Sequence, residues 1–504
     1  MTMAAPTGGT LAGQLSAREK ASLALIIFAV GAATVIAVIA GNGRFGVALA
    51  PILLVSAFYL VCRVPLRWTA AVLLTLLLSL DVSTDAAGLW HTPLVSLGDF
   101  LVKNLDLSVG VPGLKVTGLE VILALLLAIW IYRKATGSKI DGPGEVQTAA
   151  VLGDFVLVYL ASLAFAVANG LLTGGSMAIW QVRQLLHTPL FFFFFRSTLR
   201  GPQDQVLLGR IIVFSALVKA GLAAWVKHQA VTLTGGDLAY ATNHGDSILF
   251  ALAIVILLAQ LAERTDRRRL ILTAVLLPLL LWGTYANNRR LAFVDVAVGL
   301  LTLYFFGPPR PWKRAVRRFA IVAAPIAFLY LSAGWNSTSA VFRPVRTLRS
   351  LSDTRKDRST LWRDVENWNI SMSMRERPLF GIGMGKEYTE HMKNDDISGY
   401  REYRVWPHNS VLGLLLFGGL FAFTGMWALF AVTIFLAIRS VHLAQLPEHR
   451  TTALCALCAV LFCVVQAYGD GGAPFTQYRV FTGLALAVTG KLAVSTGAWP
   501  TAWR

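Results

Sequence analysis

The segment Trp406–Ser410 places a histidine and an amide side chain, His408 and Asn409, where a long polar stretch meets an apolar run. From Leu412 to Ile438 the chain is almost wholly hydrocarbon, so we expect the His408 imidazole near a membrane–water boundary. Histidine is the side chain whose unperturbed pKa lies nearest neutrality, which suits it to act as a base toward a hydroxyl. The alternative is an ordinary interfacial histidine.

Several other polar residues lie at the ends of apolar runs or just inside them. They are Arg183 with His187, then Asn243, His244 and Asp246, and then Asn287, Asn288, Arg289 and Arg290. The guanidinium fork suits phosphate oxygens. We therefore predict Arg289, Arg290 and His408 as catalytic residues, and Arg183, Asn288, Asn243 and His244 as substrate-binding residues. Asn409 and Arg358 join the substrate-binding group on the family resemblance given below. Taken alone, an arginine such as Arg183 can equally be a snorkelling anchor.

The composition indicates a polytopic membrane protein. Of 504 residues, 56% are hydrophobic and 14% are charged, whereas a soluble chain carries about 25% charged residues. The net charge of +18 fits the excess of Lys and Arg in cytoplasmic loops, so we expect no nucleic-acid partner. The pair Cys455-x-x-Cys458 lies in an apolar run and lacks the further ligands of a zinc site.

A helix crosses a bilayer in about 20 apolar residues, which predicts an all-α bundle of about 12–14 transmembrane helices. The spans are expected at 21–40, 45–62, 66–81, 117–132, 149–171, 180–196, 206–226, 246–262, 269–285, 290–306, 318–333, 410–438, 451–468 and 478–495. Basic residues cluster in alternate connections, such as 264–269 and 310–318. The positive-inside rule makes these connections and both termini cytoplasmic.

The opposite connections, including 82–116 and the turn 286–289, then lie on the outer face together with the longest one, 334–409. We therefore divide the chain into an N-terminal bundle (1–333), an outer loop with amphipathic helices (334–409) and C-terminal helices (410–504). On this topology the candidate residues named above share one membrane face.

The outer loop 334–409 has three notable parts. Apolar residues at helical spacing predict an amphipathic helix over 359–375, anchored at the interface by Trp362 and Trp368. The glycines of 381–385 predict tight backbone turning. A basic run comes first, and is either solvated or a cation-lined mouth for an anionic headgroup. Its residues are Arg343, Arg346, Arg349, Arg355, Lys356 and Arg358.

The outer segments contain no Asp-x-Asp or Glu-x-Asp pair of the kind that holds a divalent cation. Asp395 and Asp396 are adjacent, so in regular structure they would not face one ligand. We therefore expect neither a metal nor a cofactor. Instead, arginines would neutralise a diphosphate leaving group.

Four motifs in order resemble the bacterial O-antigen ligase and O-antigen polymerase superfamily. They are Arg358-x-x-x-Trp362, Pro378-Leu379-Phe380-Gly381-Ile382-Gly383, His408-Asn409-x-x-Leu412 and Gly418-Gly419-Leu420. The resemblance is densest over 280–440. It implies a GT-C-type membrane fold in the bacterial inner (cytoplasmic) membrane, with a periplasmic site that moves a glycan from undecaprenyl diphosphate to an acceptor hydroxyl, inverting and without metal.

The resemblance also implies roles for single residues. His408 corresponds to the family's loop histidine, a base or positioning group, and Asn409 to that residue's partner. Arg289 or Arg290 matches an arginine at a helix start, although Asn-Arg-Arg-Leu stands here where the family often has Ser-Arg-Gly. Arg183 resembles an earlier outer-face arginine by position only. Arg358 either contacts substrate or holds the loop.

The leading prediction is a ligase that transfers a glycan to lipid A-core or a similar acceptor. A polymerase of the same superfamily would use the same phosphate-binding arginines and stays open. A secondary transporter or lipid-glycan flippase is the alternative from another class, and it would place charges near the bilayer midplane in repeated halves. The expected partners are an undecaprenyl-diphosphate-linked glycan donor, a lipid-anchored or glycan acceptor, and membrane lipids.

Overall fold

The computed structural model describes residues 17–40, 45–82, 92–106, 115–138, 140, 147–235, 238, 240–264, 266–342, 345, 349, 358–394, 404–469, 471–472 and 475–499. The chain forms two compact units, one of Met1–Thr69 with Asp99–Gly142 and the other of Ala70–Gly98 with Pro143–Arg504. Of the predicted basic run, Arg343, Arg346, Arg355 and Lys356 lie outside the described residues, as do Asp395 and Asp396.

In the first unit, α1 (Ala17–Ala40) packs on α2 (Phe45–Val61), and α2 contacts α6 (Gly118–Thr136). A capping box of Thr117 and Glu120 begins α6. Near its other end, buried Arg133 donates to the carbonyl oxygens of Val61 and Val64 at 2.7 and 2.6 Å. These bonds tie the end of α2 to α6, because the last carbonyls of a helix have no partner within it.

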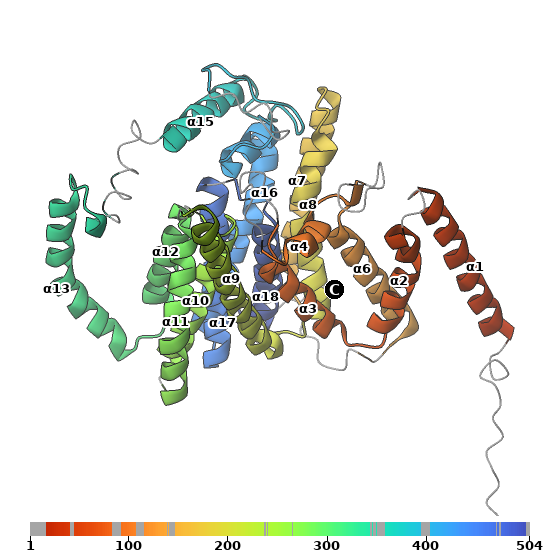
Figure 1. Cartoon of the computed structure of the whole chain (residues 1–504), viewed down its shortest axis with the longest axis horizontal. Helices are drawn as coiled ribbons and strands as arrows, with labels where there is room; N and C mark the ends of the chain where they lie inside the picture. Colours follow the sequence, from red (N-terminus) through yellow and green to blue (C-terminus); the bar gives the residue numbers. More distant parts are fainter. Residues whose placement is uncertain are drawn as a thin grey trace, which may run out of the picture. The chain divides into compact units, whose positions relative to one another are not determined.

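Two helices, α3 (Leu66–Ser79) and α4 (Val95–Val102), cross the boundary between the units. The second unit contains α7 (Ala150–Leu172), α8 (Ala178–Thr198), η3 (Pro202–Asp204), α9 (Gln205–Thr234), α10 (Asp246–Glu263), α11 (Arg267–Asn287), α12 (Arg290–Phe306), α13 (Pro311–Gly334), η4 (Ala340–Phe342), α15 (Arg358–Glu376), α16 (Ser410–Leu443), α17 (Pro447–Gly469) and α18 (Thr476–Ser495) (Figure 1). Its core is α10, which packs against α9, α11, α12 and α17 and is buried at every residue from Asp246 to Leu257.

The all-helical polytopic fold is confirmed. Within the described ranges, seven helices are long and apolar enough to cross a membrane, and shorter apolar helices accompany them. Every span expected from hydrocarbon length falls on a helix. The largest difference at a helix start is in α13, which begins at Pro311 rather than near 318, because its first turns are basic and do not register as hydrocarbon. The division at residues 333 and 409 remains a prediction.

The predicted loop helix is α15, and it packs on α16 with a polar face. Its buried side chains include Glu366, Asn369 and Ser373, whereas Leu361 and Trp368 of the predicted apolar face are 47% and 40% exposed. The Asn369 amide exchanges two hydrogen bonds of 2.8 Å with the backbone of residue 392. A polar face is buried here because the peptide groups of the loop that folds over α15 need hydrogen-bond partners.

A break in α16 receives the loop that follows α15. Gly419 adopts a φ of +58° inside α16, where the helix is interrupted. Four backbone hydrogen bonds of 2.9–3.1 Å then join the two segments, from the N–H groups of Ile382, Gly383, Leu420 and Phe421 to the carbonyl oxygens of Leu416, Phe417, Pro378 and Leu379, respectively. The loop thus satisfies peptide groups that an interrupted helix would otherwise leave unpaired in an apolar environment.

The predicted tight turning of the glycine segment is confirmed. Gly381, Gly383 and Gly385 have φ values of +71°, +91° and +79°, a region that side chains with a Cβ rarely adopt. A Cβ on Gly383 would lie 2.5 Å from the Cα of Gly170 in α7. The glycines therefore let the loop backbone lie directly on the backbone of the bundle.

Candidate functional site

One face of α15 contacts three separate elements. Thr360, Arg363 and Glu366 are spaced three residues apart, so their side chains share that face. The Arg290 guanidinium donates to Oγ1 of Thr360 at 3.3 Å, and the Arg363 guanidinium donates to the carbonyl oxygen of the last residue of α17 at 2.9 Å. The Glu366 carboxylate accepts the backbone N–H of His408 at 3.0 Å. These hydrogen bonds connect α15 to the start of α12, to the end of α17 and to the segment that enters α16.

His408 is held by two residues of α15. Its Nδ1 lies 3.3 Å from Oε2 of Glu366, whose side chain is 3% exposed, while the His408 side chain is 41% exposed. The Trp362 ring meets the imidazole edge-to-face, with centroids 4.9 Å apart and planes inclined by 76°. The Glu366 carboxylate and the Trp362 ring thus both contact the imidazole, while much of its surface stays exposed.

Asn409 has a structural role. Its side-chain oxygen accepts the N–H of Leu412 at 3.1 Å and caps α16, and the residue is buried. An Asn cap satisfies one of the unpaired N–H groups at a helix start. The cap sets the direction of the chain as it passes from His408 into α16, and contact of Asn409 with substrate remains a prediction.

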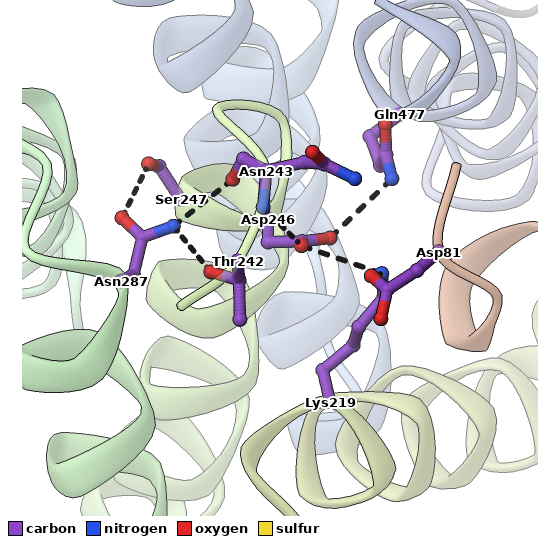
Figure 2. Close-up of polar contacts among 8 residues, drawn as sticks. All are labelled: Asp81, Lys219, Thr242, Asn243, Asp246, Ser247, Asn287 and Gln477. Atoms are coloured by element: carbon purple, nitrogen blue, oxygen red, sulfur yellow. Dashed lines mark hydrogen bonds and ion pairs between the residues drawn. The ribbon is translucent and has the colours of Figure 1, made fainter. Parts of the chain in front are cut away.

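The turn between α11 and α12 carries both candidate arginines. Asn288 adopts a φ of +49° and ends α11. The fully buried Asn287 donates to Oγ1 of Thr242 at 2.8 Å and to the carbonyl oxygen of Asn243 at 3.0 Å (Figure 2). Its side-chain oxygen accepts the backbone N–H of Arg289 at 3.3 Å. Asn287 thereby anchors the turn from which both arginines project.

The two arginines contact different partners. The Arg289 guanidinium lies 3.7 Å from the centroid of the Tyr240 ring, a cation–π arrangement. Arg290 instead reaches Thr360 of α15, the helix that also holds His408. The attachment points of Arg290 and His408, residues 360 and 366, are thus separated by about 9 Å of rise along the same helix.

The family model described as O-antigen ligase matches residues 277–427, a range that includes the arginine turn, α15 and His408. These residues form an O-antigen ligase domain. No curated protein matches the chain. The domain implies a membrane glycosyltransferase or ligase of the O-antigen ligase/polymerase family that uses lipid-linked glycan substrates.

A buried ionic network adjoins Asn243, one of the residues that Asn287 contacts (Figure 2). Lys219 of α9 is fully buried and contacts the carboxylates of Asp81 and Asp246, the latter at 3.3 Å. Asp246 also accepts the backbone N–H of Asn243 at 3.1 Å and the side-chain amide of Gln477 at 3.3 Å. The network therefore joins α9, α10 and α18 to the segment that anchors Asn287.

Replacing Lys219 with methionine is expected to destabilise the protein by about 3–5 kcal/mol, because two buried carboxylates lose their cation. Thermal unfolding in detergent measures the effect. Lys227→Met, two turns further along α9 and half-buried, is the matched control and should have a small effect. The double variant Lys219→Met/Asp246→Asn should recover part of the loss. Unfolding of Lys219→Met at the wild-type temperature would contradict a stabilising network.

The remaining predicted residues lie on α8, on α15 and in the segment just before α10. His244 stacks on Phe475, with centroids 5.5 Å apart and planes inclined by 7°. Arg183 is half-buried on α8, one turn before His187, which contacts Arg479 of α18. Arg358 is the first residue of α15, and its side chain lies outside the described residues. For all of these, contact with substrate remains a prediction.

Sequence reasoning missed several residues that build the site. Nothing in the sequence distinguishes Glu366 from the other acidic residues of the loop. Gln181 of α8 is fully buried, accepts the N–H of Gly385 at 2.6 Å and donates to the carbonyl oxygen of Val405 at 2.9 Å. Lys219 could have been singled out from the sequence, because a lysine within a predicted span is rare and usually has a function or a buried partner.

Proposed function

We propose that this protein transfers a glycan from undecaprenyl diphosphate to a hydroxyl of an acceptor such as lipid A-core, at the periplasmic face of the inner membrane. The observation that carries the proposal is the face of α15 on which Thr360 holds Arg290 and Glu366 holds His408. A cation for a phosphate and a base for a hydroxyl are the two groups that such a transfer needs.

In the proposed step, Nε2 of His408 takes the proton of the acceptor hydroxyl while that oxygen attacks the anomeric carbon. The bond from the anomeric carbon to the phosphate oxygen breaks, and undecaprenyl diphosphate leaves with the bonding electrons. Attack from the face opposite the leaving group inverts the anomeric carbon. The imidazolium then returns its proton to water, which restores the base.

The arginines would stabilise the charge that develops on the departing diphosphate. The guanidinium groups present fixed pairs of donors to phosphate oxygens and remain charged at any physiological pH. We assign Arg290 the more direct role, since Arg290 bonds the helix that holds His408, whereas Arg289 lies on Tyr240. Because these cations supply the neutralising charge, we propose that the transfer is independent of divalent metal.

The topology belongs to the same proposal. Connections rich in Arg and Lys are assigned to the cytoplasm together with both termini, which leaves α15, His408 and the turn of Arg289 and Arg290 on the periplasmic side. There the polar headgroups of two lipid-anchored substrates can meet while their hydrocarbon chains stay in the bilayer.

The test is transfer in liposomes from an undecaprenyl-diphosphate glycan in the presence of EDTA. We expect the wild-type protein to release undecaprenyl diphosphate and to form an inverted glycosidic bond with the acceptor. A glycan on lipid A-core identifies a ligase, and a lengthened lipid-linked chain identifies a polymerase. An absolute requirement for added Mg²⁺ or Mn²⁺ would refute metal independence. Movement of the lipid-linked glycan across the liposome, without release, would instead indicate a flippase.

A further inference from the structure

An acidic side chain, Glu366, is buried directly beside the imidazole of His408. Burial of a carboxylate is costly unless the group is hydrogen-bonded or paired. Among the described residues, Glu366 meets that requirement through His408, whose backbone N–H lies 3.0 Å from one carboxylate oxygen and whose Nδ1 lies 3.3 and 3.4 Å from the two oxygens. The polar face of α15 therefore presents this carboxylate to the exposed side chain of His408.

The chemistry of the contact fixes the tautomer of the ring. An ionised carboxylate has acceptors and no donor, so the Nδ1 that faces Glu366 must carry a proton. In the neutral imidazole the lone pair is then on Nε2, the nitrogen that can accept a proton from a substrate. The edge-to-face contact of Trp362 with the ring limits its rotation away from the carboxylate.

We propose that Glu366 is the positioning residue of His408, which holds Nδ1–H and leaves Nε2 as the proton acceptor. The inference rests on the transferase function proposed above. When Nε2 takes the acceptor proton, the positive charge on the imidazolium develops next to the buried Glu366 carboxylate, which attracts it. The proton taken up by Nε2 leaves from the same nitrogen to water.

The substitution Glu366→Gln separates this role from a merely structural one. The amide oxygen of Gln can still accept the His408 backbone N–H, so the loop keeps its anchor. The amide NH₂, however, donates to Nδ1 and selects the tautomer with its proton on Nε2, which cannot act as a base. We expect kcat to fall by about 10²–10⁴-fold, the range seen when a carboxylate that orients a catalytic histidine becomes an amide. KM for the lipid-linked donor should be nearly unchanged.

The matched control is Glu376→Gln, which makes the same change on the exposed last turn of α15 and should leave kcat at the wild-type value. Glu366→Asp keeps the charge and should retain more activity than Glu366→Gln. If Glu366→Gln turns over like the wild type, Glu366 only anchors the loop and the inference is wrong.

A second measurement does not depend on transfer. With ¹⁵N-labelled histidine, the His408 resonances, assigned by their loss in His408→Ala, should show the Nδ1–H tautomer in the wild type and the Nε2–H tautomer in Glu366→Gln. If the wild type shows this tautomer but transfers no glycan, the proposed function fails while the Glu366–His408 contact stands. If the wild type transfers glycan and the His408 signal is unchanged by Glu366→Gln, the inference alone fails.

Discussion

His408→Ala is expected to abolish glycan transfer, with kcat reduced by about 10²–10⁴-fold or more, because the proposed general base is lost. The binding of the lipid-linked donor should persist, since that is assigned to the arginines. Stability should also persist, because the side chain is 41% exposed and the backbone N–H that bonds Glu366 remains in the variant. Initial rates of undecaprenyl diphosphate release and thermal unfolding in detergent together measure these effects.

The chain offers a close control for this variant. His391 also meets a tryptophan of α15 edge-to-face, Trp368 at 6.2 Å, and His391→Ala should transfer glycan at the wild-type rate. Turnover of His408→Ala at the wild-type rate would show that His408 is not the general base. A loss of donor binding in the same variant would instead assign His408 to recognition of the donor.

Arg290→Ala is expected to weaken the engagement of the donor by about 1.5–3 kcal/mol, the free energy of a charged hydrogen bond to phosphate, which corresponds to about 10- to 150-fold in Kd. Arg290→Lys should be intermediate, because it keeps the charge but loses the paired donors. Arg289→Ala should have the smaller effect, since that guanidinium lies on the Tyr240 ring. Donor titration in detergent, followed by the quenching of tryptophan fluorescence, measures Kd.

Arg375→Ala, at the exposed end of α15, controls for the loss of one positive charge from the outer loop. If Arg375→Ala weakens binding as much as Arg290→Ala, the loop attracts anions only through its overall charge. A larger loss in Arg289→Ala than in Arg290→Ala would exchange the roles assigned to the two arginines.

The spans and the loop helix could be predicted because the length and spacing of hydrocarbon side chains determine them locally. The buried face of α15 could not be predicted, because Asn369 and Ser373 pair with loop peptide groups whose position depends on the whole fold. Asn409 illustrates an ambiguity of a different kind. Its place after His408 favours a substrate-binding residue, whereas the structure uses its side-chain oxygen to cap α16, a role typical of an Asn just before a helix.

The interruption of α16 at Gly419 has a practical consequence for chimeric enzymes. Four backbone hydrogen bonds join Leu416–Phe421 to residues 378–383, so the loop that follows α15 and the first part of α16 form one exchangeable module. The family match likewise ends at residue 427, just beyond the break. A graft cut between α15 and α16 would separate the donors of these hydrogen bonds from their acceptors. A graft cut after residue 427 would carry both halves of the pairing into the new host.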